Sequence, residues 1–294
     1  MTIKEIDTIV DEGVSLKYIA QAYSEIASLK VKKIRGAVER NRQFLEEISK
    51  VYGIIKAFAI DKKIALVKPK KRLSIVITSN YKFYGNINTS LINYFIGSTQ
   101  ELPDMDKIIL GRGAVDYFRT SKLLSNYNEV LLKDDLPTPA ELASLAQQIS
   151  QYNQVLVFYS KFKSLLLQRA TFADITAVSF YIKAFHIARL GSKAQNSKDK
   201  DKFYEFLFEP ELPKVLQFFE TQILTLLLEQ TFLESELSRT ASRFISMDTA
   251  QSEADKFIKE YQKLKGYTKR NLENNKILEN YSSLFARKGI HDSI

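Results

Sequence analysis

The sequence contains no cysteine, and its two histidines, His186 and His291, lie far apart. Without cysteine the chain can form no disulfide, no thiolate metal site and no cysteine nucleophile. Neither histidine has a second one at a ligand-like spacing such as H-x-x-x-H, so we expect no catalytic zinc site. No other residue pattern indicates a bound group, and we expect no cofactor.

Proline and glycine are also scarce, with six prolines and ten glycines in 294 residues. Both residues interrupt helices, so their scarcity predicts long uninterrupted elements. No long segment is predominantly apolar, and we therefore expect no membrane-spanning helix. The opening residues, MTIKEIDTIVDEG, include acids and lack an apolar core, so we expect neither a secretory signal nor a transit peptide.

Positive charge is in excess, with 43 Lys and Arg against 34 Asp and Glu, a formal charge of +9. This excess favours an acidic partner surface, which could be a protein, a nucleic acid or a layer of membrane headgroups. Because solvated helix faces also carry many basic residues, the charge alone does not choose among these partners.

Residues 14–58 have the apolar spacing of one long amphipathic helix. Steps of three, four and seven residues place the apolar side chains on one stripe, and no proline interrupts them. We expect this stripe to pack against a partner helix. Its expected members are Ile19, Tyr23, Ile26, Ile34, Val38, Leu45, Ile48, Tyr52 and Ile55.

The middle of the chain alternates short apolar runs with helix-like segments. The basic cluster KPKKR at 68–72 is expected to be a solvated linker before a strand at 73–79, and further strands are expected at 107–110, 129–132 and 154–159. Helices are expected at 88–95 and after Thr138, where Thr-Pro-Ala-Glu predicts a capped N-terminus. Strands alternating with helices predict parallel pairing in a small α/β domain. The polar stretch 192–202 is expected to be a mobile loop.

From Pro213 to Phe285 there is no further proline and one glycine, Gly266. A helix of this length would span roughly 110 Å. Its apolar residues recur every three or four positions, which is typical of a helix with one partner helix. They are Leu237, Ala241, Phe244, Met247, Ala250, Ala254, Phe257, Tyr261 and Leu264.

The expected fold class is therefore α/β with a long α-helical coiled coil, in which antiparallel N- and C-terminal helices flank a small Rossmann-like α/β domain. The expected divisions are 1–60 for the first helix, 70–205 for the globular domain and 206–294 for the second helix. A four-helix bundle is the alternative, and it would need a break in the last segment, for which Gly266 is the candidate.

Six stretches of the sequence, taken in chain order, match motifs of one known family. LKYIAQAYSEIASLKVKK resembles its "TQKITKAMKMVAAAKLRK", LSIVITSNYKFYGNINTSLI its "ITSDRGLCGG-N", and KIILGRGAVDYF its "IGRKGRDFF". NQVLVFYSKFKSLLLQ resembles "DEVYLVYNKFVSALSQ", YEFLFEPELPKVL resembles "YEFEPSPEEVL", and ESELSRTASRFISMDTAQSEADKFI resembles "ESLASEHAARMVAMDNATDNAGELI". The family is the gamma subunit of F-type ATP synthases.

This resemblance implies a central-stalk rotor that is not an enzyme by itself but a non-catalytic subunit of a proton-translocating ATP synthase. The implied partners are the alpha and beta subunits of the catalytic ring, the epsilon subunit and the ring of c subunits. No nucleic acid is expected, and membrane contact is expected only through the complex. The implied location is the cytoplasmic face of an energy-transducing membrane, the plasma membrane of a bacterium.

The resemblance also carries over two sets of partner-contact residues. The set implied to contact the beta subunit and the catalytic ring is Tyr23, Lys269, Arg270 and Glu279. The set implied to contact the c ring from the lower stalk is Lys30, Lys32, Lys33, Phe206 and Glu209. Neither set is catalytic, cofactor-binding or metal-binding.

Three other interpretations compete with this one. A nucleotide-binding enzyme would carry G-x-G-x-x-G after a strand, and Gly111-Arg112-Gly113 lacks the third glycine. A nucleic-acid-binding protein would use basic and aromatic residues, but most tyrosines here fall on apolar helix stripes. A non-rotary coiled-coil scaffold of the same fold is the third, because Lys82, Phe83, Tyr84 and Asn86 replace most of the family's turn glycines and residues 273–277 depart from its "ITQEL".

Overall fold

The computed structural model describes residues 1–61, 71–100, 105–124, 126–176 and 209–291. The chain folds as two units. Residues Ala27–Arg243 form the sheet unit, and Met1–Ile26 with Phe244–Ile294 form the end unit. The expected loop at 192–202 and most of the KPKKR cluster lie outside the described residues.

Two long helices supply the first and last elements of the chain. Helix α1 spans Ile3–Asp61 and helix α6 spans Leu212–His291. Helix α1 begins before residue 14, where the apolar spacing starts, and within the expected division 1–60, because Thr2 and Glu5 form a reciprocal cap. The Glu5 amide donates to Thr2 Oγ1 at 3.3 Å, and the Thr2 amide donates to Glu5 Oε2 at 2.9 Å.

The sheet unit contains a five-stranded sheet with the order β3-β2-β1-β4-β5. The strands are β1 (Arg72–Ile77), β2 (Met105–Leu110), β3 (Asn128–Val130), β4 (Gln154–Phe162) and β5 (Gln168–Asp174). β1 to β4 are parallel, as expected, but β5 is antiparallel to β4 and was not predicted. The turn between β4 and β5 is too short for a crossover, so it can join only antiparallel strands.

Among the described residues, three short helices accompany the strands: α2 (Ile87–Gln100), α3 (Arg112–Ser121) and α4 (Pro139–Ile149). The predicted cap of α4 is confirmed, since the Glu141 amide donates to Thr138 Oγ1 and the Glu141 side chain accepts from the Thr138 amide. α2 and α3 pack on one face of the sheet, where Phe95, Phe118 and Phe158 meet in edge-on ring contacts. Helix α3 was not predicted.

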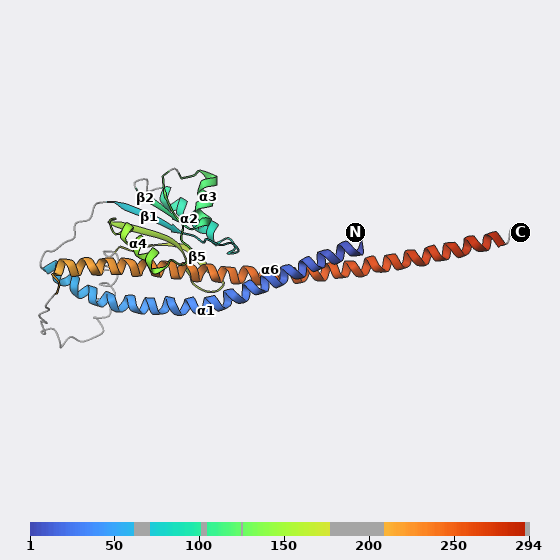
Figure 1. Cartoon of the computed structure of the whole chain (residues 1–294), viewed down its shortest axis with the longest axis horizontal. Helices are drawn as coiled ribbons and strands as arrows, with labels where there is room; N and C mark the ends of the chain where they lie inside the picture. Colours follow the sequence, from blue (N-terminus) through green and yellow to red (C-terminus); the bar gives the residue numbers. More distant parts are fainter. Residues whose placement is uncertain (62–70, 101–104, 125, 177–208, 292–294) are drawn as a thin grey trace. The chain divides into compact units, whose positions relative to one another are not determined.

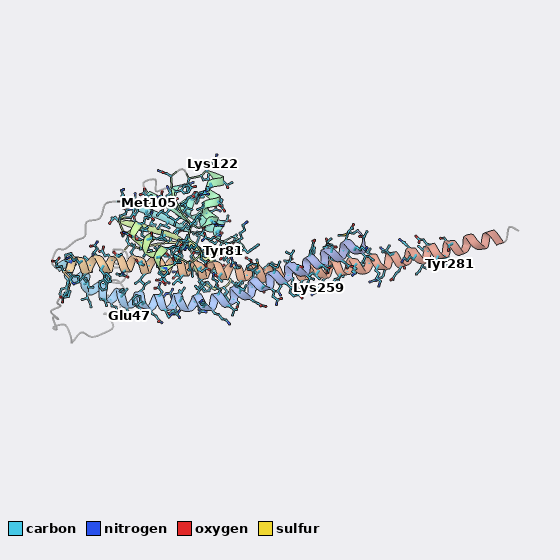
Figure 2. The ribbon with its side chains drawn as sticks, in the orientation of Figure 1. Glu47, Tyr81, Met105, Lys122, Lys259 and Tyr281 are labelled. Atoms are coloured by element: carbon cyan, nitrogen blue, oxygen red, sulfur yellow. The ribbon has the colours of Figure 1, made fainter. Side chains whose placement is uncertain are left out.

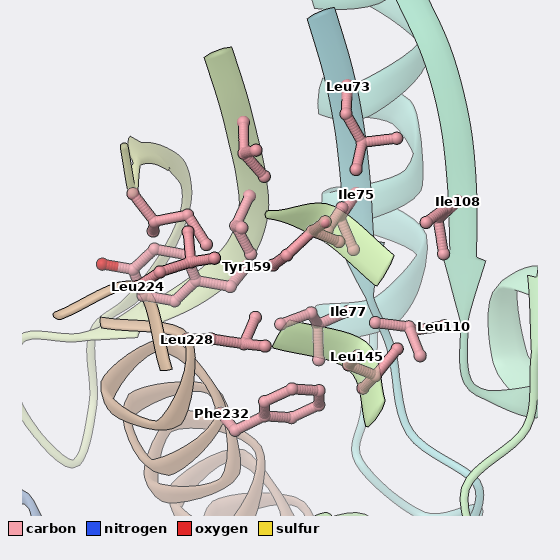
Figure 3. Close-up of a cluster of buried hydrophobic side chains, with 14 of the residues drawn as sticks. Leu73, Ile75, Ile77, Ile108, Leu110, Leu145, Tyr159, Leu224, Leu228 and Phe232 are labelled. Carbon is pink, nitrogen blue, oxygen red and sulfur yellow. The ribbon is translucent and has the colours of Figure 1, made fainter. Parts of the chain in front are cut away.

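The opposite face of the sheet packs against α4 and the first part of α6 (Figure 1). Leu224, Leu228 and Phe232 project from α6 towards the sheet (Figure 3). There they meet the alternate apolar side chains of the central strands. Those strand residues include Leu73, Ile75, Ile77, Ile108, Leu110, Val155, Val157 and Tyr159. In this stretch α6 therefore belongs to the core of the α/β domain as well as to the helix pair.

On its other side, the same stretch of α6 packs antiparallel to α1. Tyr52, Ile55 and Ala59 of α1 meet Leu212, Leu216 and Ile223 of α6. Further along, Val31, Ile34 and Val38 meet Leu237 and Ala241. The predicted pair of long helices around a small α/β domain is confirmed.

In the end unit, small residues form the contact face of α1. Ala20 and Ser24 are buried, and a Cβ on Gly13 would lie 3.2 Å from side-chain atoms of Ile258 and Phe257. Lys17 pairs with Asp255 at 2.7 Å and Lys265 with Asp7 at 2.5 Å, which fixes an antiparallel register.

The expected apolar stripe is only partly right for this part of the chain. Its α6 members Phe244, Met247, Ala254 and Tyr261 are partly buried. Ile19 and Ile26 of α1 are 54% and 56% exposed, however, and among the described side chains of α6 in this unit Ile258 rather than Phe257 is buried. The prediction counted large apolar residues, whereas close helix approach selects small ones at the seam. Beyond the partner helix, the described side chains of α6 from Lys269 onward are exposed, and Tyr281 marks this stretch in Figure 2.

Candidate functional site

The middle of α6 is polar in sequence and yet buried. Residues 234–242, ESELSRTAS, are all buried because α1 covers one side and the α/β domain the other. Ordinary amphipathic helices keep such residues on an exposed face. We call this region the junction network: Lys30, Tyr84, Asp135, Glu236, Arg239, Ser242 and Arg243.

Glu236 is the anion at the centre of the junction network. It is fully buried, and its carboxylate accepts from the Lys30 ammonium of α1 at 2.5 Å and from Arg239 at 3.0 Å. A buried carboxylate is tolerated only when it is paired and hydrogen-bonded. Glu236 therefore joins α1 to α6 through charge as well as through packing.

Arg239 connects α6 to the α/β domain. Its guanidinium is 1% exposed and donates to Ser235 Oγ at 3.0 Å and to the backbone carbonyl of Asp135 at 3.2 Å. Asp135 lies in the loop 131–138 after β3. The carboxylate of Asp135 accepts from the backbone N–H of Asn80 at 2.6 Å and from the Tyr84 hydroxyl.

Tyr84 lies in the loop 78–86 that follows β1, and α6 holds this loop from two positions. Ser242 Oγ donates to the Tyr84 carbonyl at 2.7 Å. Arg243 donates to the Lys82 carbonyl at 2.9 Å, and its guanidinium carbon lies 3.9 Å from the centre of the Tyr84 ring. These contacts stabilise a loop in which Phe83 has a φ of 68°, an unusual backbone conformation for a bulky residue.

Burial raises the pKa of the Tyr84 phenol far above its ordinary value, and the charges of Glu236 and Asp135 raise it further. The hydroxyl therefore stays protonated and acts as a donor to Asp135. Burial likewise raises the pKa of Tyr159, whose hydroxyl donates to Glu234 at 3.2 Å, with Glu234 as the second cause.

The carboxyl edge of a doubly wound sheet is where such folds bind ligands. In this unit the loops after β1 and β3 meet at that edge, and α6 contacts both through Arg239, Ser242 and Arg243. Gly111, the first glycine of the Gly-Arg-Gly sequence considered above as a nucleotide site, is explained by packing. It has a φ of 91°, and a Cβ there would lie 2.3 Å from the Thr78 carbonyl oxygen. Within the described ranges, no group of three or more His, Asp or Glu side chains has the arrangement of a metal site.

An open cavity of about 600 Å³ lies in the sheet unit between α1, the β4–β5 edge and α6. Arg42 and Glu234 line it and form an ion pair at 3.6 Å. Gln230 also donates to Glu234, at 2.9 Å. Nearer the end of α1, Lys56 pairs with Glu220 at 3.4 Å. Charged contacts thus recur along the α1–α6 interface of this unit.

The residues of the lower-stalk set have different surroundings. Lys30 faces α6 and is engaged by Glu236, whereas Lys32 and Lys33 are exposed on α1. Glu209 is exposed ahead of α6, and Phe206 lies outside the described residues.

The other expected contact residues lie in the end unit. Tyr23 is 36% exposed on α1, and Lys269, Arg270 and Glu279 are exposed along α6. Arg270 lies over the ring of Tyr267 at 5.4 Å. These side chains are available on helix surfaces, but their positions do not define a pocket.

The junction network was not predicted from the sequence; Lys30 was expected only as a lower-stalk contact, not as a partner of Glu236. The available signal was the run 234–242, in which every residue except Leu237 and Ala241 of the apolar stripe is polar, over more than two turns without a proline or glycine. Such a concentration of polar residues in a long packed helix indicates that polar partners approach from elsewhere in the fold.

None of the described helices combines the length and the apolar character needed to cross a bilayer. The family model described as ATP synthase matches residues 2–268 of the chain. Among curated proteins, the chain is 21% identical to the ATP synthase gamma chain of Ruthia magnifica, over 87% of this chain and 89% of that one. It is 20% identical to the gamma chain of Stenotrophomonas maltophilia R551-3, over 88% and 90%.

Two solved structures share the fold. The Tetrahymena thermophila mitochondrial ATP synthase central stalk and c ring contains a chain that aligns with a TM-score of 0.57 and 20% identity, over 79% of this chain and 99% of that one. A chain of the Euglena gracilis mitochondrial ATP synthase aligns with a TM-score of 0.53 and 14% identity, over 88% and 95%. The long helix pair with an inserted α/β domain is therefore an architecture already known from solved assemblies.

Proposed function

The chain belongs to the ATP synthase family, and on that premise we propose that it is the gamma subunit, the central-stalk rotor, of an ATP synthase. The match over residues 2–268, nearly the whole chain, is the observation that carries the proposal. Both curated relatives described above are gamma chains, and they are covered over most of their length. The rotor couples rotation of a membrane ring to ATP synthesis or hydrolysis on other subunits.

The geometry suits a part that transmits torque. A rotor must keep its globular domain fixed to its shaft, and α6 here packs into the sheet core while pairing with α1. The junction network adds hydrogen bonds from α6 to the loops after β1 and β3. Buried, hydrogen-bonded polar networks resist rearrangement because breaking one contact leaves another group unsatisfied.

Catalysis is proposed to lie on the beta subunits, with this chain contributing none of the reacting groups. Its proposed partners are alpha, beta, epsilon and the c ring, with no nucleic acid and with membrane contact only through the complex. We propose a peripheral location on the cytoplasmic face of a bacterial plasma membrane. The organisms of the two curated relatives support that location.

Exposed polar and basic side chains are suited to surfaces that slide past a partner, because such contacts give orientation without deep burial. On this basis Tyr23, Lys269, Arg270 and Glu279 remain the proposed contacts with the catalytic ring. Lys32, Lys33, Phe206 and Glu209 remain the proposed contacts of the lower stalk. Lys30 belongs to the same proposed set, although its ammonium is already held by Glu236. The division into 1–60, 70–205 and 206–294 is likewise kept as a proposal.

Co-expression with the alpha and beta subunits of the same source tests the function. The expected result is a complex with one copy of this chain per three alpha and three beta subunits, whose ATP hydrolysis depends on the chain. Native mass and ATPase rate measure both properties. A chain that stays a monomer or a homo-oligomer and leaves hydrolysis unchanged would instead support the non-rotary scaffold.

A further inference from the structure

The turn between β4 and β5 carries three consecutive exposed leucines. Leu165, Leu166 and Leu167 are 44%, 82% and 54% exposed. Single exposed leucines are common on protein surfaces, but a contiguous apolar patch marks a site of interaction. Phe172, on the adjoining strand β5, is also exposed and lies opposite Phe158 in the β4–β5 register.

Basic residues flank these leucines on both strands. Lys161, Lys163 and Arg169 are exposed, and no acidic residue occurs from Ser160 to Ala173. Lys161 lies directly opposite Arg169 in the antiparallel register. Like charges in such a cross-strand pair destabilise a sheet, so folding alone gives no reason for the arrangement.

The described residues do not neutralise this charge. Within the described part of the chain, none of the three basic side chains forms an ion pair. Glu46, Asp174 and Glu234 line the same cavity as Lys161, but Glu234 pairs with Arg42, and Asp174 accepts from Gln154 and Thr176. The hairpin therefore presents apolar and cationic groups together, and an anionic partner would relieve the repulsion between Lys161 and Arg169.

The tip is held in one conformation by its own hydrogen bonds. The Lys163 and Ser164 amides donate to the Leu167 carbonyl at 3.1 and 3.0 Å, and the Leu167 amide donates to the Ser164 carbonyl at 3.2 Å. The Gln168 side-chain amide donates to the Ser164 carbonyl at 3.1 Å and to the Leu165 carbonyl at 2.6 Å. At its base, Phe162 packs against the Val31, Ile34 and Leu237 cluster.

We propose that this hairpin tip, residues 161–169, is a docking site for an acidic amphipathic segment of a partner protein. The apolar side chains of that segment cover Leu165, Leu166 and Leu167, and its carboxylates bind Lys161, Lys163 and Arg169. A rigid surface with charges at fixed spacing favours a shaped protein segment over a fluid lipid layer, because little ordering is needed on binding. The site is defined by these contacts alone and does not depend on the rotor function.

A defined pair of probes tests the site on the full chain. The first is a short fluorescent helical peptide with leucines on one face and glutamates on the other; the second has lysine in place of each glutamate. Fluorescence anisotropy is expected to detect binding of the acidic peptide, weakened by added salt, and no binding of the lysine peptide.

Matched variants locate the binding on the chain. Leu166→Ser and Lys163→Gln are each expected to weaken binding of the acidic peptide about tenfold. Leu123→Ser and Lys122→Gln alter an exposed leucine and an exposed lysine elsewhere on the same domain and are expected to leave binding unchanged. Because all four side chains are exposed, circular dichroism should be the same for each variant.

Three results would overturn the proposal. The first is absent binding of the acidic peptide. The second is equal weakening by tip and control variants, which would assign the affinity to general positive charge. The third is sedimentation of the chain with phosphatidylglycerol vesicles that depends on Leu166 while the acidic peptide does not bind, which would make the tip a membrane contact. Each of these results leaves the co-expression test of the rotor function unaffected.

Discussion

The Lys30 ammonium of α1 lies 2.5 Å from the carboxylate of Glu236 in the buried middle of α6. The same carboxylate holds Arg239, which in turn donates to the Asp135 carbonyl of the α/β domain. One buried anion thus connects both long helices with the globular domain.

Glu236→Gln removes the charge that compensates Lys30 and Arg239. We expect unfolding free energy to fall by about 3 kcal/mol, because a buried guanidinium loses its counter-ion. Urea unfolding followed by circular dichroism measures the loss. Glu253→Gln is the matched control: its pair with Lys256 is exposed, so the expected change is under about 0.5 kcal/mol. Equal losses of unfolding free energy in both variants would show that the buried ion pairs of Glu236 contribute no more to stability than an exposed ion pair.

Replacing both members of the buried pair is expected to cost less than breaking it. In Glu236→Leu/Arg239→Met the two opposite charges disappear together, so no buried ion is left without its partner within α6. The double variant should therefore be more stable than Glu236→Leu alone, in which the buried guanidinium of Arg239 keeps no counter-ion, and the difference is obtained from a double-mutant cycle in urea. Additive single effects would contradict the coupling.

Gly111 and Gly266 should respond to alanine in opposite directions. At Gly111 the new Cβ would meet the Thr78 carbonyl oxygen at 2.3 Å with a φ of 91°, so we expect a loss of about 3 kcal/mol or more. At Gly266, which lies within α6 with nothing within 4 Å of a Cβ, alanine should stabilise by about 0.5–1 kcal/mol. Thermal unfolding of the two variants gives both signs, and a stabilising change at Gly111 would contradict the close approach.

Helices and strands whose apolar residues recur with a clear period could be predicted from the sequence. Elements that depend on contacts with residues far away in the chain could not. The two long helices and the capped start of α4 follow from apolar spacing and from Thr-Pro-Ala-Glu. Strand β5 has a mixed pattern of partly buried residues, so its period gave little signal until its hairpin with β4 was known. The apolar spacing alone places the start of α1 at residue 14, because the Thr2–Glu5 cap precedes the apolar stripe, whereas the expected division 1–60 includes the observed start at Ile3.

The junction was missed for a different reason. Glu236, Asp135 and Tyr84 are far apart in sequence, and nothing local indicates that they meet. Propensity treats Ser235, Thr240 and Ser242 as surface residues of a helix, whereas here their small size lets α1 and the domain approach α6. Burial of this kind is a tertiary effect. Its local signal in the sequence is the concentration of polar residues at 234–242 within a long packed helix.

Stability should fall at alkaline pH because of the buried tyrosines. The pKa values of Tyr84 and Tyr159 are raised in the folded chain, chiefly by burial. Their contribution to the free energy of unfolding is complete below the pKa of tyrosine in the unfolded chain, about 10. It is lost as pH rises above that pKa, since the unfolded state then releases protons that the folded state retains. At one pH unit above that pKa, each tyrosine should lower the free energy of unfolding by on the order of 1 kcal/mol.

Urea unfolding between about pH 8 and pH 11 measures this loss. In Tyr84→Phe/Tyr159→Phe the decline should be shallower than in the unaltered chain. Tyr81→Phe, at an exposed side chain, is the matched control and should leave the decline unchanged. A decline that is the same in all three proteins would mean that other groups cause it.

Direct observation of rotation tests the central claim. The absence of cysteine allows a single Leu123→Cys substitution, at an exposed position of the α/β domain, to carry a bead on a complex with surface-fixed alpha and beta subunits. We predict that ATP drives the bead in one continuous direction and that rotation stops when ATP is removed. A complex that contains the chain and hydrolyses ATP while the bead stays still would contradict the assignment of this chain as the rotor.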